Sequence, residues 1–273
     1  MDKSLLVIGR PNSTKTAFIT QLYNRLLVKA GDLILDKPVD DISPIKTSRE
    51  ALANGEEPQS TYGAKRQKLE VLAKYKDQII NLSCPDYGGE QIDKIISERQ
   101  VDSAWKSAIN GSESWLFFIR LTSIDHHPDL STATIDKTVE TKKTENESEY
   151  KISDQTAMLE ALQIFLDVKG HDYHLKNEKV NLVIALTCWD ELNTEDKPIE
   201  VLKKSLPLLF NFLESNWNKK RLKVWGLSAQ GFSLNIPENA EKYQIYGPEK
   251  FGYVVDETGA QHDDLTKLVI AAL

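Results

Sequence analysis

A glycine, a lysine and several hydroxyl residues stand close together near the start of the chain, after a short apolar run at residues 4–9. The segment reads Gly9-Arg10-Pro11-Asn12-Ser13-Thr14-Lys15-Thr16. In such a loop, backbone N–H groups can surround phosphate oxygens, Lys15 can reach the β- and γ-phosphates of a nucleotide, and the Thr16 hydroxyl can bind Mg²⁺. The pattern expects glycine where Thr14 stands, because glycine lets the backbone approach phosphate closely or take a positive φ. The segment predicts a phosphate-binding loop with one altered position, and a chance glycine loop is the alternative.

A second polar motif follows the apolar run at residues 78–84. It reads Asp86-Tyr87-Gly88-Gly89-Glu90-Gln91. Asp86 at a strand end can hold Mg²⁺ through water, and the Gly89 N–H can donate to a γ-phosphate. An ordinary Asp-Gly turn is the alternative. A carboxylate, an ammonium group and a hydroxyl together favour a nucleotide-phosphate site.

Hydrophobic periodicity predicts the elements that position these motifs. Strands are expected at residues 4–9, 68–74, 78–84, 114–120, 180–187 and 222–227. Helices are expected at residues 16–30, 47–54, 92–109, 153–168 and 198–217, the last of them kinked at Pro207. This alternation is typical of an α/β fold with a three-layer, doubly wound, mostly parallel sheet, here with one antiparallel edge strand. Such folds bind ligands at the carboxyl ends of their strands, where both motifs lie.

The composition indicates a globular chain. With 273 residues, of which 40% are hydrophobic and 27% charged, it can bury a sizeable core. We expect a single domain over residues 1–273, with a polar insertion at about 125–150 and a C-terminal extension or closing helix at about 240–273. A formal charge of −7 without a basic stripe argues against a nucleic-acid partner.

The chain shows no feature of a membrane or secreted protein. No apolar run approaches the roughly 20 residues of a membrane span, and no signal peptide is visible. The two cysteines, Cys84 and Cys188, suit a reducing cytoplasm, where each would be a small buried hydrophobe. These observations predict a cytoplasmic location without a transmembrane segment.

On these motifs the sequence resembles the Ras-like P-loop GTPases of the translation-factor-related class. Residues 9–16 look like the GRPNVGKS loop of bacterial Era-type members. After a later predicted strand, Thr187-Cys188-Trp189-Asp190 stands at the place of the family's N-K-x-D. The aspartate of that motif accepts hydrogen bonds from guanine, and its lysine stem packs on the base. Asp190 matches the motif, whereas Cys188 replaces the lysine.

Two further family elements can be placed by their order in the chain. Ser228-Ala229-Gln230 resembles the S-A-K loop, in which the Ala229 N–H would contact guanine and Gln230 would stand in for lysine. Thr61 is placed like the family threonine that closes on Mg²⁺ and the γ-phosphate, and Ser60 is the alternative.

The resemblance implies a Mg²⁺-dependent protein that binds GTP and GDP, hydrolyses GTP slowly and acts as a molecular switch on an effector or activating protein. Catalysis is expected from Lys15 together with Glu90 or Gln91. Ras-like enzymes orient the attacking water with a glutamine at the place of Glu90, and here the glutamine comes one residue later. The sequence assigns no arginine finger: Arg10 lies in the loop, Arg99 lies on the next helix, and a partner protein is the other source.

More narrowly, the long stretch before the switch segment, residues 83–89 and the tail resemble the double-GTPase proteins of bacterial conflict systems. Asn12 matches an asparagine with which some Era-like relatives hold K⁺. Two alternatives stay open. One is a degenerate, non-hydrolysing P-loop scaffold, which Thr14, Cys188 and Glu90 favour. The other is an ATPase or nucleotide kinase of related fold.

Overall fold

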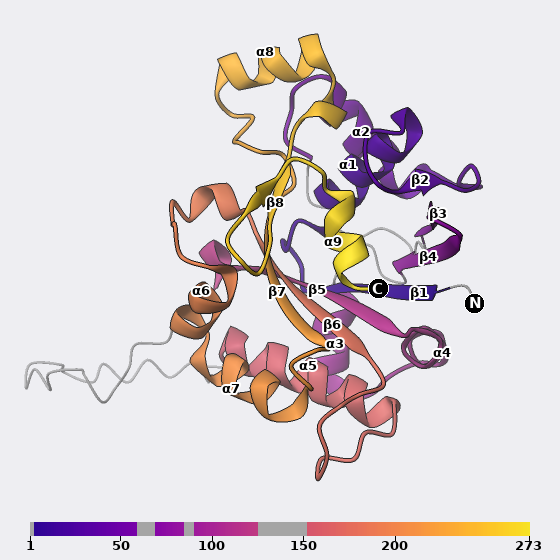
Figure 1. Ribbon diagram of the computed structural model, residues 1–273, viewed down its shortest axis with the longest axis vertical. Coiled ribbons are helices and arrows are strands. Elements are labelled where there is room, and N and C mark those ends of the chain that lie inside the picture. The colour runs from indigo at the N-terminus through magenta and orange to yellow at the C-terminus, as the bar shows by residue number, and fades with distance from the viewer. Residues whose placement is uncertain (1–2, 59–68, 85–89, 125–151) are drawn as a thin grey trace, which may run out of the picture.

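A central β-sheet runs through the molecule and is covered by helices on both faces (Figure 1). The computed structural model describes residues 3–58, 69–84, 90–124 and 152–273. Within these residues the sheet has nine strands in the order β2-β3-β4-β1-β5-β6-β7-β8-β9. The strands are β1 (Lys3–Gly9), β2 (Ile34–Leu35), β3 (Leu69–Tyr75), β4 (Gln78–Cys84), β5 (Ser114–Arg120), β6 (Asn181–Thr187), β7 (Leu222–Ser228), β8 (Tyr253–Val255) and β9 (Gln261–His262).

Most of the sheet is parallel. Strands β4, β1, β5, β6 and β7 run parallel to one another. Antiparallel strands extend both edges, β3 and β2 beyond β4, and β8 and β9 beyond β7. The predicted doubly wound sheet with an antiparallel edge strand is confirmed. The second antiparallel edge is not foreseen, because strands of three and two residues are too short to show an alternating pattern.

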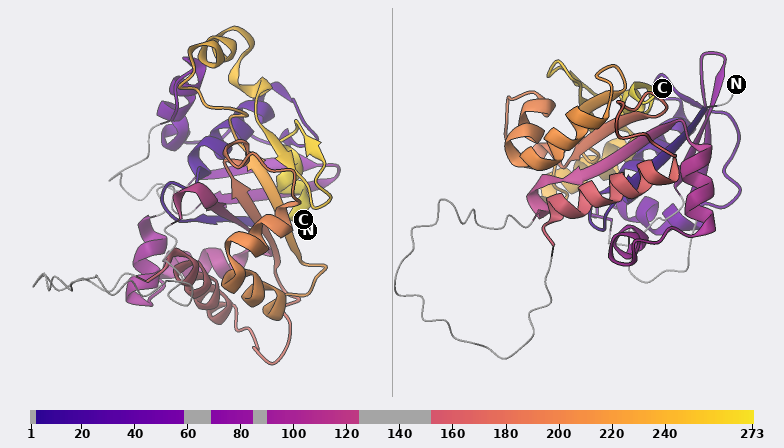
Figure 2. Two further views of the ribbon diagram at one scale, coloured as in Figure 1. Left: turned by 90° about the vertical axis from the view of Figure 1, so that its left-hand side faces the viewer. Right: turned by 90° about the horizontal axis from the view of Figure 1, so that it is seen from below.

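Helices on the two faces complete the three layers (Figure 2). One hydrophobic cluster packs α1, α2 and α9 against the sheet, and a second packs α3 to α7 against the opposite face. The helices are α1 (Lys15–Val28), α2 (Ser43–Ala53), α3 (Glu90–Glu98), α4 (Ser103–Gly111), α5 (Asp154–Val168), α6 (Pro198–Ser205), α7 (Pro207–Asn216), α8 (Pro237–Tyr246) and α9 (Thr266–Ala271), with short 3-10 turns η1 (Leu121–Ser123), η2 (Trp189–Glu191) and η3 (Pro248–Lys250).

The central strands are buried on both faces. In β1, Leu5 and Val7 belong to one cluster and Leu6 and Ile8 to the other, as the two-residue period of a strand requires. In β5, the Phe118 ring packs against Phe18 of α1, with ring centroids 5.2 Å apart. These strands therefore hold the loops at their carboxyl ends on a rigid support.

The helix predicted over residues 92–109 is in fact two helices, α3 and α4. Arg99 follows α3 with a φ of 51°, a left-handed conformation that cannot continue a helix. Asp102 then caps α4 by accepting a hydrogen bond from the Trp105 N–H at 2.9 Å. Apolar residues continue at helical spacing on both sides of the break, which explains why the sequence indicated one helix.

The predicted helix over residues 198–217 is also two helices. The break lies at Leu206, and Pro207 begins α7 instead of kinking a continuous helix. α2 begins four residues before its predicted start, with Pro44 in its first turn. α1 ends two residues early, at a left-handed Lys29. The six predicted strands, which are β1, β3, β4, β5, β6 and β7, and the helix α5 agree with their predicted ranges to within about a residue, whereas β2 has no predicted counterpart.

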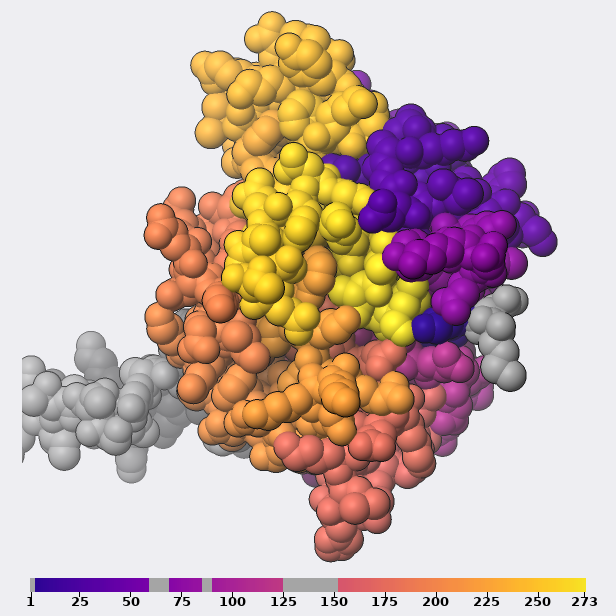
Figure 3. Space-filling model, in the orientation of Figure 1, coloured from indigo at the N-terminus to yellow at the C-terminus, as the bar shows by residue number. Residues whose placement is uncertain are grey.

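The C-terminal residues pack beside the first elements of the chain (Figure 3). Lys3 Nζ donates to the Leu273 carbonyl at 2.6 Å, and the Asp32 N–H donates to Asp264 Oδ2 at 3.0 Å. α9 lies in the tail where a closing helix is expected. Among the described residues, no helix has the length and apolarity needed to cross a bilayer.

Candidate functional site

The loop between β1 and α1 has the backbone geometry of an anion-binding nest. Asn12 and Thr14 have φ values of 60° and 61°, so left-handed residues alternate with the others along the loop. This alternation turns successive N–H groups toward one concavity. Thr14 thus takes a backbone conformation that suits glycine, at a cost of about 1–2 kcal/mol for a residue with a Cβ.

Lys15 braces this loop from within. Its side chain is buried, and Nζ donates to the Arg10 carbonyl at 2.9 Å and to Ser13 Oγ at 3.2 Å. Ser13 Oγ in turn donates to the Arg10 carbonyl at 2.7 Å. At Gly9 a Cβ would lie 2.6 Å from Ser13 Oγ, so the close return of the loop requires glycine there. The ammonium group is therefore fixed beside the nest.

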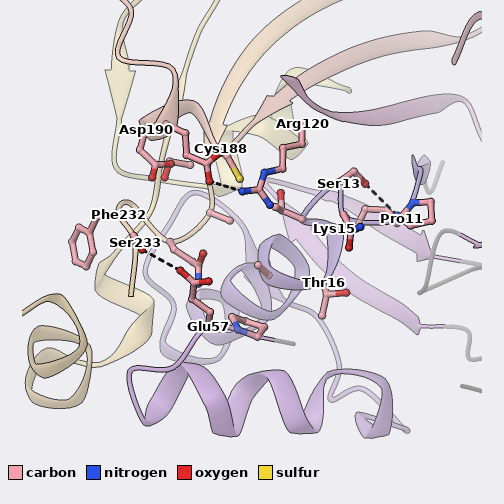
Figure 4. Close-up of a pocket in the computed structure, with 18 of the residues that line it drawn as sticks. Pro11, Ser13, Lys15, Thr16, Glu57, Arg120, Cys188, Asp190, Phe232 and Ser233 are labelled. Atoms are coloured by element: carbon pink, nitrogen blue, oxygen red, sulfur yellow. Dashed lines mark hydrogen bonds and ion pairs between the residues drawn. The ribbon is translucent and has the colours of Figure 1, made fainter. Parts of the chain in front are cut away.

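The predicted site residues of several loops meet in one pocket of about 300 Å³ (Figure 4). The pocket lies at the carboxyl ends of the strands, as expected for a doubly wound sheet. The structure brings these predicted residues to its wall: Asn12, Ser13, Thr14, Lys15, Thr16, Glu90, Asp190, Ser228, Ala229 and Gln230. The sequence predicts that all of these residues belong to one site, and the structure places them around one pocket.

Two loops form the side of the pocket away from the nest. Asp190 lies in η2, directly after Cys188, whose φ is 52°. After β7, Ser228 Oγ accepts a hydrogen bond from the Gly231 N–H at 2.9 Å, and the Gln230 carbonyl accepts one from the Tyr243 hydroxyl at 2.6 Å. An aspartate acceptor and a fixed loop thus face the phosphate nest across the pocket.

Gln230 has a buried amide nitrogen, Nε2, with no hydrogen-bond partner among the described residues. A buried donor without a partner costs about 1–3 kcal/mol, and the residue that carries it lines the pocket.

The expectation for the cysteines is half right. Cys84 is buried, whereas Cys188 is partly exposed and lines the pocket. Its position after the carboxyl end of β6 places it at the rim of the sheet rather than in the core. Burial raises the pKa of the Cys188 thiol to about 12, although Arg120 acts in the opposite direction. The thiol is therefore neutral near pH 7.

The two residues expected near the attacking water are placed differently. Glu90, the first residue of α3, lines the pocket. Gln91 Oε1 instead accepts a hydrogen bond from Trp105 Nε1 of α4 at 2.7 Å. Other expected residues lie outside the described part of the chain, namely Ser60, Thr61, Asp86, Gly89 and the insertion at about 125–150.

The arginines named from the sequence are engaged elsewhere. Arg10 Nε donates to Asp93 of α3 at 2.6 Å, and its guanidinium also pairs with Asp154 of α5. Arg99 pairs with Glu160 at 2.8 Å on the surface. In this structure both guanidinium groups are therefore held by carboxylates of neighbouring helices.

Sequence reasoning missed Arg120, the last residue of β5. Arg120 lines the pocket, and Figure 4 shows it between Ser13 and Lys15 on one side and Cys188 and Asp190 on the other. Its place at the carboxyl end of a central strand was the available signal, because ligands gather at that edge. Further lining residues that no motif marked are Glu57, Pro58, Glu191, Phe232, Ser233 and Asn235.

The residues present fit a magnesium ion that is held mainly by its nucleotide. Among the described residues there is no group of three or more His, Cys, Asp or Glu side chains that could bind a metal by themselves. Mg²⁺ in nucleotide sites typically takes one or two protein oxygens, with phosphate and water supplying the rest. Thr16, in the pocket wall beside the nest, offers one such oxygen.

The doubly wound sheet and the loop after β1 define a P-loop GTPase of the Ras-like class. The family model of Double-GTPase 1 matches residues 6–272, and the chain belongs to this family. It is accordingly a GTP-binding protein of a family of GTPases. Proteins of this fold generally use Mg²⁺.

Solved structures resemble this chain at low identity. Translation elongation factor SelB from Methanococcus maripaludis, in complex with the GTP analogue GppNHp, is 14% identical, with a TM-score of 0.41 over 90% of this chain and 35% of its own. The Arl6 BBS3 small GTPase from Trypanosoma brucei, with a bound nucleotide analogue, is 14% identical, with a TM-score of 0.40 over 90% of this chain and 98% of its own.

The Ski7 GTPase-like domain from S. cerevisiae, bound to GTP, is 12% identical, with a TM-score of 0.42 over 84% of this chain and 43% of its own. The chain thus spans about a third of the SelB chain and less than half of the Ski7 chain. No curated protein matches the sequence.

Proposed function

We propose that the chain binds Mg²⁺-GTP in the pocket beside the β1–α1 loop, hydrolyses it slowly and acts as a molecular switch on a partner protein. One observation carries this proposal: the nest around Lys15, the Asp190 carboxylate and residues 228–230 line one pocket. A nucleoside triphosphate has an anionic tail and a hydrogen-bonding base at opposite ends. The pocket offers complementary groups at opposite sides.

The phosphate tail would lie against the nest. Backbone N–H groups of residues 12–16 would donate to its oxygens, and Lys15, which already holds the loop, would neutralise their charge. The Thr16 hydroxyl, with Asp86 and Thr61 of the undescribed segments, would hold Mg²⁺. The ion would supply charge stabilisation for the leaving phosphate oxygens.

The guanine base would lie against the opposite wall. Asp190 would accept hydrogen bonds from the N1 and N2 positions of the base, and the backbone N–H of Ala229 would donate to its O6. Gln230 lines the same wall of the pocket. Ser228 holds this loop in shape through its bond with Gly231.

Slow turnover follows from the residues beside the phosphate side of the pocket. Glu90 lines the pocket, and a carboxylate there can accept a proton from water but cannot donate to the γ-phosphate as a glutamine amide does. Gln91 is engaged with Trp105. The developing charge of the transition state would therefore need help from outside, either an arginine from an activating partner or K⁺ held at Asn12.

We also propose the setting in which the switch works. Residues 1–273 would form a single GTPase domain with a polar insertion and a C-terminal extension. The resemblance to double-GTPase proteins supports a role in a bacterial conflict system, inside the cytoplasm. The effector would be a protein, because the chain carries a net charge of −7 and nucleic acids repel such a surface.

Direct binding measurements test the nucleotide proposal. Calorimetric titration of the intact chain with Mg²⁺-GTP, GDP and ATP should show a preference for guanine nucleotides. Lys15→Ala should weaken GTP binding by about 100-fold, because it removes a buried, charge-assisted contact to phosphate. Lys220→Ala, an exposed lysine in the turn before β7, is the matched control and should leave affinity unchanged.

The base assignment has its own test. Asp190→Asn should move preference from guanine toward xanthine nucleotides, because an amide can donate to the extra carbonyl. Unchanged base preference in this variant would contradict the role given to Asp190.

A non-hydrolysing scaffold is the second candidate, favoured by the threonine at a left-handed position in the nest and by Glu90 at the pocket wall. This candidate predicts no phosphate release and no effect of Lys15→Ala on the chain's interactions. Steady release of phosphate from GTP, measured over several turnovers, would exclude it. Equal binding of ATP would instead favour a related ATPase.

A further inference from the structure

The pocket contains a second cation whose role the nest does not explain. Among the described lining residues, Lys15 and Arg120 are the cationic side chains, whereas Glu57, Glu90, Asp190 and Glu191 carry carboxylates. Lys15 is bound into the phosphate loop. Arg120 is therefore the cation available to the remaining half of a bound nucleotide.

Arg120 is held in a defined place at the carboxyl end of β5. In the parallel β5–β6 ladder, Arg120 pairs with Thr187, which directly precedes Cys188. Its Nη2 donates to Glu191 Oε1 at 2.6 Å, and its Nε lies 3.2 Å from Thr122 Oγ1. Thr122 Oγ1 donates to Glu191 Oε2 at 2.6 Å, which closes the network. The guanidinium is thus fixed from two sides.

These contacts leave N–H donors and the planar faces of the guanidinium for a ligand. They use two of its five N–H donors, and they do not occupy its planar faces. A planar guanidinium can stack on an aromatic ring while its edge donates to oxygens. The side chain is 33% exposed, so one part of it faces the open pocket.

The neighbouring Cys188 provides the room for such a contact. Its side chain is short and uncharged, and it lines the same pocket beside Asp190. Figure 4 shows the Arg120 guanidinium between Cys188 and the residues of the phosphate loop. Because Cys188 is short, no long side chain from this position would separate the Arg120 guanidinium from a base that is hydrogen-bonded to Asp190.

We propose that Arg120 holds the nucleoside half of the ligand, stacking its guanidinium on the purine ring and donating to ribose oxygens. This inference rests on the proposed nucleotide site. Glu191, the residue after Asp190, positions the arginine, so η2 supplies both the base acceptor and the anchor of the stacking cation. The contact is shared by GTP and GDP.

Arg120→Met removes the charge and the planar face at similar length. GTP and GDP should both bind about tenfold more weakly, as expected for loss of a cation–π contact with its hydrogen bonds. Mg²⁺-tripolyphosphate, which has no nucleoside, should displace a fluorescent guanine nucleotide from the phosphate loop with an unchanged inhibition constant. Arg99→Met, which removes an exposed arginine that pairs with Glu160 of α5, should change neither the nucleotide affinity nor the tripolyphosphate inhibition constant.

A rescue variant sharpens the test. Cys188→Lys should restore much of the lost GTP affinity in the Arg120→Met background, because a long cationic side chain would enter the same space. Arg120→Lys, which retains the charge beside Glu191 but lacks the planar face, should show an intermediate loss. Urea unfolding of each variant establishes that it is folded.

Three outcomes would overturn the inference. Arg120→Met and Arg120→Lys could bind GTP as the wild type does, tripolyphosphate affinity could fall as much as GTP affinity, or Cys188→Lys could fail to rescue. If the wild-type chain itself bound no guanine nucleotide, the proposed function would fail as well. That result is distinguishable, because it is seen before any Arg120 variant is measured.

Discussion

Single residues in left-handed conformations shape the candidate site. Asn12 and Thr14 give the nest its curvature, and Cys188 turns the chain from β6 into η2, which carries Asp190. Asparagine adopts this conformation with little strain, whereas β-branched threonine rarely does. The loop keeps its phosphate-binding form even where the sequence departs from glycine, and the cost is local strain.

Replacing Thr14 with glycine should relieve that strain. The Thr14 hydroxyl makes no cap hydrogen bond to α1, so little is lost with the side chain. We expect Thr14→Gly to raise the free energy of unfolding by about 1 kcal/mol and to strengthen GTP binding, measured by urea unfolding and calorimetry. Thr47→Gly, at an exposed right-handed position within α2, should instead lower stability by a few tenths of a kcal/mol. Destabilisation of both variants would show that Thr14 is not strained.

At the scale of elements, Arg10 joins the phosphate loop to two helices. It bonds to Asp93, which is 41% exposed on α3, and to Asp154, which is 12% exposed at the start of α5. α3 begins at Glu90, within the motif at residues 86–91, so one side chain connects the phosphate loop to the helix that carries the end of that motif. This connection ties together parts of the chain that are more than 80 residues apart.

Loss of this bridge should weaken the fold. Arg10→Met removes two charge-assisted hydrogen bonds at a half-buried site, and we expect the free energy of unfolding to fall by about 1–3 kcal/mol in urea titrations. Arg99→Met removes an exposed ion pair and should cost less than about 0.5 kcal/mol. Equal losses in the two variants would contradict the structural importance of the Arg10 bridge.

The β8–β9 hairpin should make stability depend on acid pH. Burial acts to raise the pKa of Asp256, but hydrogen bonds from His262, Thr258 and the Ala260 backbone outweigh it and hold that pKa well below its usual range. A carboxylate with a depressed pKa contributes stability above its unfolded value near pH 4, and this stability is lost as the pH falls toward the folded value.

We therefore expect the wild-type chain to lose unfolding free energy more steeply than Asp256→Asn between about pH 5 and pH 2, measured by urea denaturation at each pH. At neutral pH the variant should be the less stable protein, and the difference should shrink on acidification. Parallel pH curves for the two proteins would rule out this contribution of Asp256.

At the scale of the whole molecule, the C-terminal third supports the base side of the pocket. Tyr243 of α8 is fully buried, donates to the Gln230 carbonyl at 2.6 Å and accepts from Gln21 Nε2 of α1 at 3.0 Å. Arg25 of α1 donates to the Phe251 carbonyl at 2.7 Å. The first helix and the tail therefore hold the loop after β7 between them.

Removal of the Tyr243 hydroxyl should loosen that loop. Tyr243→Phe leaves the ring in place but takes away both hydrogen bonds, and we expect a loss of about 1–3 kcal/mol in unfolding free energy. GTP should also dissociate several-fold faster in stopped-flow measurements. Tyr246→Phe, at a 63% exposed position on the same helix, is the control and should match the wild type. Unchanged dissociation in Tyr243→Phe would separate α8 from the site.

The sequence by itself determined which segments form the central strands and in what order they follow along the chain, the extent of α5 and the local loop around Lys15. These features depend on residues that are neighbours in the chain, such as Ser153 capping α5 through the Thr156 N–H. Short-range hydrogen bonding and apolar spacing leave a readable pattern.

Only the tertiary structure decided the engagement of Gln91 by Trp105, the position of Arg120 in the pocket and the second antiparallel edge. Each depends on groups from elements that meet in space. Arg120 and Glu191 are 71 residues apart, and no local spacing relates them. Side-chain partners across a sheet are set by the packing of whole elements, which the periodicity of one segment does not contain.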